Sequence, residues 1–126
     1  MELLGNLADG FFIAFEPLNL GLMIVGVIVG LFIGAMPGLG SVNGVAILLP
    51  MTFLVPPTSA IIFLAAIYYG AMYGGAISSI MLGIPGACTA VATTFDGRPL
   101  ALKGEADKAL IGAAMASFVG GTISII

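Results

Sequence analysis

The sequence predicts an all-α integral membrane protein with several spanning helices and broken or re-entrant segments between them. Of its 126 residues, 60% are hydrophobic and only 7% are charged, whereas a soluble domain carries roughly 25% charged residues. Between Glu16 and Asp96 the chain has no Asp, Glu, Lys, Arg or His. A water-exposed loop of ordinary length would hold at least one charge. Most of this interval is therefore expected to lie in lipid, or in protein that lipid surrounds.

Three segments are long and apolar enough to be membrane spans, at about residues 18–36, 60–82 and 105–126, since a crossing needs about 20 apolar residues. Residues 1–17 carry phenylalanines at roughly helical spacing and are expected to form a lead-in at the membrane interface. The three basic residues of the chain fall within a predicted polar loop, 94–108. Positive charge favours the cytoplasmic side, so this loop is expected to face the cytoplasm.

Glycines recur every four residues in two of these spans. Gly26, Gly30 and Gly34 lie in the first, and Gly70 and Gly74 lie in the second. Glycine at this spacing makes a flat stripe on which another helix can approach closely. We therefore predict that these five residues are helix-packing positions.

Two apolar helices are each followed by a Pro-Gly break, at Pro37-Gly38 and at Pro85-Gly86. Proline disrupts a helix, and in lipid every backbone polar group needs a partner. Such breaks survive where they are buried in protein or line a wet cavity, as in the discontinuous helices of secondary transporters. The apolar stretch after the first break, residues 41–55, is short for a full crossing. It is expected to be a half-helix or a hairpin.

Small polar side chains and glycines at both breaks are the candidate ligand-binding residues. Helix N-termini offer N–H groups to an anion, and hydroxyl, amide and carbonyl oxygens can bind a hard cation. The candidate substrate-binding residues are Pro37, Gly38, Gly40, Ser41, Asn43, Pro85, Gly86 and Thr89. The candidate cation-binding residues are Ser41, Asn43 and Thr93. The alternative for each polar residue is that it only caps a half-helix.

Enzymatic chemistry is not indicated. With no His and one Cys, the sequence excludes His/Cys metal sites and Cys–His catalysis within its length. The Gly-Leu-Gly-Ser run at 38–41 lacks the lysine of a nucleotide-binding P-loop. The net charge of −3 comes from a few residues near the first end and in the polar loop, and it does not indicate a nucleic-acid partner. Asp96-Gly97 is most simply a turn, and no metal or cofactor is expected.

Four motifs closely resemble the large permease subunit of the tripartite tricarboxylate transporter family. They are GAMPGLG (34–40), AILLPMTF (46–53), AIYYGAMYGG (66–75) and GIPGACTAVATTFDGRPLALKG (83–104). The similarity spans about residues 18–121, in order and with natural spacing. Several motifs that agree together are far more specific than any single glycine motif.

The resemblance implies a multi-pass permease of the bacterial inner membrane that takes up tricarboxylates or related carboxylates. It also implies coupling to a cation gradient, usually Na⁺ and otherwise H⁺, and two partners, a small membrane subunit and a periplasmic solute-binding protein. Residues 109–126 run apolar to the end without a polar stop, so we expect the N-terminal part of a longer protein. The resemblance implies that this part belongs to one half of an inverted-repeat secondary transporter. Two alternatives stay open: a carboxylate or anion permease or channel without a binding protein, and a non-transporting membrane scaffold held by glycine contacts.

Overall fold

The computed structural model describes all residues, Met1–Ile126, and consists of helices and the turns that join them. Its elements are α1 (Glu2–Ala14), α2 (Pro17–Ala35), α3 (Gly40–Leu48), the 3₁₀ helix η1 (Leu49–Leu54), α4 (Pro57–Leu82), the 3₁₀ turn η2 (Cys88–Ala90), α5 (Val91–Leu102) and α6 (Ala106–Ile125). Three of them, α2, α4 and α6, are long and apolar enough to cross a membrane. The prediction of an all-α membrane protein is confirmed.

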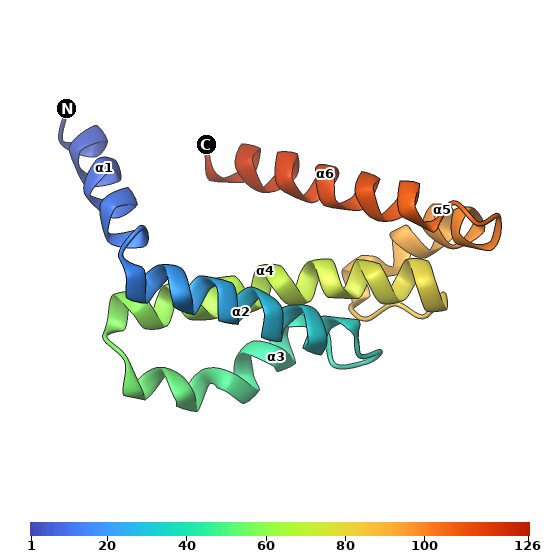
Figure 1. The fold of residues 1–126 in the computed structure, drawn as a ribbon, viewed down its shortest axis with the longest axis horizontal. Coiled ribbons are helices and arrows are strands. Elements are labelled where there is room, and N and C mark those ends of the chain that lie inside the picture. Colours follow the sequence, from blue (N-terminus) through green and yellow to red (C-terminus); the bar gives the residue numbers. More distant parts are fainter.

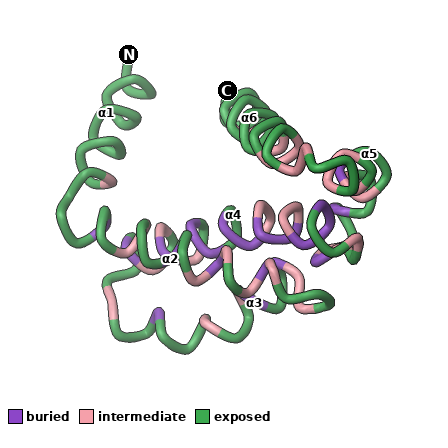
Figure 2. Tube along the Cα trace, turned by 45° about the vertical axis from the view of Figure 1, so that its right-hand side comes forward, coloured by how far each residue is buried: buried purple, intermediate pink, exposed green.

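Helix α4 is the central element of the fold. Helices α2 and α3 lie against it, and α6 returns along it after the turn through α5 (Figure 1). Buried residues concentrate along α4, whereas α1 and α6 have none (Figure 2). The side chains of Ile67 and Ile80 are completely buried on α4. The exposed faces of the outer helices are largely apolar, as expected for surfaces that meet lipid or further protein within the membrane.

The contact between α2 and α4 is a close approach of two glycine stripes. The buried residues of α2 are Asn19 and three glycines, Gly26, Gly30 and Gly34. A methyl group on Gly26 would lie 2.8 Å from the Ala66 Cβ. Because a side chain at Gly30 or Gly34 would meet backbone atoms of α4 even more closely, the two helix backbones can approach this far only with glycine at these positions.

The stripe on α4 is reciprocal. A Cβ atom at Gly70 would overlap the Val27 carbonyl oxygen, and one at Gly74 would overlap the Leu31 carbonyl oxygen. All five glycines singled out in the sequence therefore lie at the α2–α4 contact. Tyr73 extends from the same helix toward α6, where its hydroxyl donates a 3.1 Å hydrogen bond to the Leu110 carbonyl oxygen.

The segment after the first break folds as a short helix that is continued by a 3₁₀ helix. The chain reverses after Ala35, and α3 and η1 then run back to the start of α4 (Figure 1). Ser41 and Gly44 are buried in α3, where a Cβ at Gly44 would lie 2.9 Å from the Ile33 Cγ2. Together α3 and η1 cover residues 40–54, close to the expected half-helix or hairpin at 41–55. That this segment enters the membrane stays a prediction.

The predicted polar loop at 94–108 is wrong over most of its length, because residues 91–102 form α5 and only Lys103–Glu105 connects it to α6. The Asp96-Gly97 pair is therefore helical and not a turn. Gly97 is buried, and a Cβ there would lie 2.6 Å from the Ile80 Cγ1. Packing of α5 on the end of α4 overrides the local turn and helix-breaking signals of Gly97 and Pro99.

Candidate substrate site

The two Pro-Gly breaks, far apart in the sequence, lie side by side in the fold. A Cβ atom at Gly40 would be 3.8 Å from the Gly86 carbonyl oxygen. Gly86 itself is inserted between the end of α2 and the side of α4. A methyl group on it would lie 2.8 Å from both the Gly75 Cα and the Ser78 Oγ, and it would overlap the Gly34 carbonyl oxygen. Only glycine fits at position 86 without displacing the second break.

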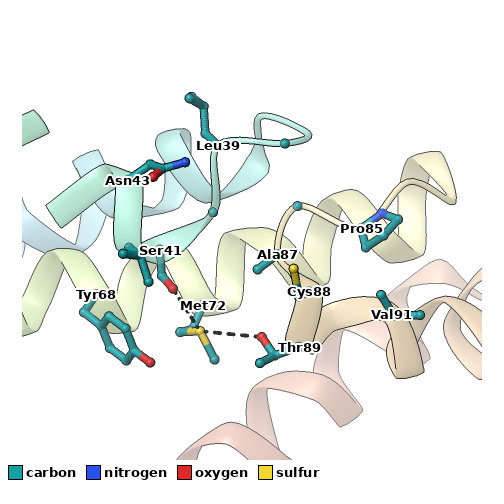
Figure 3. Close-up of a pocket in the computed structure, with 14 residues that line it drawn as sticks. Leu39, Ser41, Asn43, Tyr68, Met72, Pro85, Ala87, Cys88, Thr89 and Val91 are labelled. Carbon is teal, nitrogen blue, oxygen red and sulfur yellow. Dashed lines mark hydrogen bonds between the residues drawn. The ribbon is translucent and has the colours of Figure 1, made fainter. Parts of the chain in front are cut away.

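A cavity of about 500 Å³ opens between the breaks (Figure 3). Candidate residues from the sequence that line it are Gly38, Gly40, Ser41, Asn43, Pro85, Gly86 and Thr89. Pro37 does not line the cavity, and Thr93 lies one helical turn beyond Thr89 on α5, outside the lining. The structure thus brings together most of the predicted site. That these residues bind a substrate or a cation stays a prediction.

Sequence reasoning missed the residues that α4 contributes, Tyr68 and Met72. They are four residues apart and therefore lie on one face of the helix. The same spacing is visible in the sequence, but it does not say which face of α4 turns toward the breaks. The remaining lining residues are neighbours of the predicted ones: Leu39, Val42, Ala87, Cys88 and Val91.

Two hydroxyls from different breaks converge on one sulfur atom in this cavity. The Ser41 hydroxyl donates to the Met72 Sδ at 3.4 Å, and the Thr89 hydroxyl donates to the same atom at 3.8 Å. Figure 3 shows Met72 between them. Ser41 is buried, whereas Thr89 is exposed to the cavity opening. Asn43 lies two residues further along α3, and its amide points away from Met72 (Figure 3).

Two helix N-termini also meet at the cavity. The first residues of α3, from Gly40 to Asn43, line it, and so do Cys88 and Thr89, where η2 leads into α5. Neither start has a side-chain capping hydrogen bond. The first N–H groups of a helix have no partner within the helix and carry a positive partial charge. No acidic or basic side chain lines the cavity, so no side-chain charge opposes these backbone dipoles.

The conformation of the first break requires glycine at two positions. Gly38 and Gly40 have φ angles of +89° and +69°, in the region that L side chains rarely adopt. Together they turn the chain from α2 into α3 within four residues, Met36 to Leu39. This tight reversal places the start of α3 at the cavity.

Comparison with known proteins gives one family. The model of the "Tripartite tricarboxylate transporter TctA family" matches residues 20–126. A curated relative from Agrobacterium vitis, described as an uncharacterized 52.8 kDa protein in the TAR-I ttuC' 3'region, is 41% identical over 124 residues, which is 98% of this chain. The chain spans about a quarter of that relative's length, 25%. No solved structure matches the chain.

Proposed function

The chain belongs to the tripartite tricarboxylate transporter TctA family, and on that premise we propose that it forms part of a permease subunit that takes up tricarboxylates or related carboxylates. The resemblance drawn from the four sequence motifs is confirmed by the family match. The family is one of transporters, and the three long apolar helices agree with a membrane subunit. The substrate, the coupling ion and the partners belong to the proposal.

The observation that carries the proposal is the meeting of two uncapped helix N-termini at one cavity. A helix N-terminus carries roughly +0.5 of an elementary charge, and its N–H groups bind carboxylate or phosphate oxygens readily. No carboxylate side chain lines the cavity, so no negatively charged side chain there repels an anionic substrate. The Ser41 and Thr89 hydroxyls add two hydrogen-bond donors at the same place.

For the coupling cation, Ser41 and Asn43 are the proposed ligands from this chain, because both line the cavity and supply oxygen atoms. Thr93, which lies outside the lining, is the weakest of the three candidates. The proposed ion is Na⁺, with H⁺ as the alternative.

The proposed partners are a small membrane subunit and a periplasmic solute-binding protein, in a bacterial inner membrane. The tripartite family description supports a three-component system. The exposed apolar helices α1 and α6 are consistent with a chain that has further contacts within the membrane.

Uptake by cells that express the full-length subunit with its two partners tests the proposal. We expect accumulation of labelled citrate or another carboxylate that requires both a sodium gradient and the binding protein. Uptake that persists without sodium would contradict the proposed coupling ion, and uptake without the binding protein would contradict the three-component mechanism. Failure to accumulate any of a panel of tricarboxylates, dicarboxylates and aromatic acids would contradict the proposed substrate class.

Gly38→Val separates a transporter from a membrane scaffold. No atom lies within 4 Å of a Cβ placed at Gly38, and the positive φ angle makes the substitution a local strain in the break. A transporter variant should stay assembled and lose uptake, whereas a scaffold should show its defect in assembly. Gly112→Ala, in open space on α6, is the matched control and should change neither.

A further inference from the structure

We propose that Met72 is a positioning residue that holds the Ser41 and Thr89 hydroxyls toward the cavity until an oxygen of the bound carboxylate takes them over. The inference rests on the proposed function and adds a residue from α4 to the site. The Met72 sulfur on α4 connects the two breaks, because the two hydroxyls that donate to it come from different breaks. Met72 is half-buried and lines the cavity.

Most of the other serine and threonine hydroxyls that form a hydrogen bond donate to a carbonyl oxygen of their own helix; Ser59, which donates to Asn19, is the exception. Ser and Thr side chains in helices commonly bond back to a carbonyl oxygen of the preceding turn. Ser79 does so to Gly75, Thr94 to Ala90 and Thr122 to Phe118. Ser41 and Thr89 instead donate to a side chain on another element. Both residues lie at the start of a helix, where no preceding turn of the same helix offers a carbonyl oxygen, and the Met72 sulfur supplies the acceptor instead.

The chemistry of the sulfur suits a temporary acceptor. A thioether sulfur is a weak hydrogen-bond acceptor, whereas hydrogen bonds to a carboxylate are roughly twice as strong as neutral ones. A carboxylate oxygen entering the cavity would therefore replace the sulfur. The methionine side chain has three rotatable bonds and can move aside without strain. The donors would be already oriented when the ligand arrives, which lowers the cost of binding.

Met72→Leu keeps the apolar volume and removes the acceptor. In the full-length transporter with its partners, we expect KM for carboxylate uptake to rise about threefold to tenfold, the worth of a single hydrogen bond, with Vmax within about twofold. Met81→Leu is the matched control, because Met81 is on the same helix, has an exposed side chain and lies outside the cavity. An unchanged KM in Met72→Leu would overturn the proposal.

A mutant cycle separates positioning from packing. If Met72 acts through the two hydroxyls, Met72→Leu should have little further effect on KM in a Ser41→Ala/Thr89→Val background, because the groups that it orients are gone. If Met72 only shapes the cavity, the same fold increase should appear in both backgrounds. That additive outcome would overturn the assigned role, whatever the size of the single-mutant effect.

Alkylation of Cys88 tests the hydrogen bond between Thr89 and Met72 without relying on uptake. Cys88 is exposed, lines the cavity and precedes Thr89. In membranes that contain the full complex, the N-ethylmaleimide reaction of the Cys88 peptide is followed by mass spectrometry. Met72→Leu should speed it about twofold to threefold by releasing Thr89, and Met81→Leu should not. An unchanged labelling rate in Met72→Leu would overturn the proposal that Met72 holds Thr89. Absence of uptake in the wild-type complex counts instead against the proposed function, and this labelling result still stands.

Discussion

The Ser59 hydroxyl donates a 2.6 Å hydrogen bond to the Asn19 Oδ1, and both side chains are buried. The Asn19 amide nitrogen in turn donates a 2.6 Å hydrogen bond to the Ile13 carbonyl oxygen. The Asn19 side chain thus joins the first turn of α2, where it lies, to the last turn of α1 and the first turn of α4. It fixes the bend at Phe15–Glu16 and the end of the α2–α4 pair opposite to the cavity.

Ser59→Ala should lower the stability of the folded protein by about 0.5–2 kcal/mol, the range for hydrogen bonds between membrane helices. The loss leaves the Asn19 Oδ1 without its donor in a buried position. Thermal unfolding of the detergent-purified full-length protein measures the effect. Asn6→Ala, on the exposed α1, is the control and should leave the midpoint in place. Equal midpoints for the two variants would show that the buried pair contributes nothing.

Gly30→Ala should disrupt the α2–α4 contact. Its new methyl group would overlap the Ile67 carbonyl oxygen, a backbone atom that cannot move without separating the helices. We expect a destabilisation of about 1–3 kcal/mol, typical of overpacking, and a clear fall in folded yield on size-exclusion chromatography.

Gly21→Ala is the matched control for this prediction. Gly21 lies on the same helix, but nothing is within 4 Å of its Cβ position. Alanine favours the helix more than glycine does, so this variant should be neutral or slightly stabilised. A similar yield for the two variants would contradict the close-packed contact.

Gly86→Ala tests the close packing of the second break against α2 and α4. The added methyl group would meet Gly75, Ser78 and the Gly34 carbonyl oxygen together. Residues 85–90 would have to shift, which would move one helix N-terminus away from the other. We expect carboxylate uptake to fall at least about tenfold, since small misplacements in a binding site can have large effects, with the protein still present in the membrane. Gly75→Ala, whose nearest contact would be an ordinary 3.5 Å, should transport normally.

The long helices could be predicted from the sequence because length and apolar composition are local properties. The packing glycines could also be located, since a small residue every fourth position marks a helix face wherever the partner lies. Both breaks could be identified because a Pro-Gly pair after an apolar helix is also a local signal. Their contact across 46 residues, from Gly40 to Gly86, depends on how α2 and α4 cross. That crossing is a tertiary property, and neither break carries a signal for it.

Met72 and α5 show where local patterns stop being informative. In the sequence, Met72 looks like one apolar residue among many. It becomes part of the site because the glycine face of α4 packs against α2, which leaves the face that carries Met72 toward the breaks. In α5, the local pattern of Asp96-Gly97 predicts a turn. The structure uses Gly97 as a small residue beneath Ile80. The two uses of glycine look identical in a sequence.

Arg98→Met should weaken the junction between α4 and α5. The Arg98 guanidinium donates a hydrogen bond to the Met81 carbonyl oxygen, and its side chain lies 3.3 Å from the Cβ position of Gly83, the residue that ends α4. A cation at a helix C-terminus contributes about 0.3–1 kcal/mol, so the loss should lower the unfolding midpoint slightly. Hydrogen exchange should also accelerate in the last turn of α4. Arg98→Lys should recover part of the effect, and Lys103→Met, at an exposed position, should have none. Equal exchange in all three variants would rule out a capping role for Arg98.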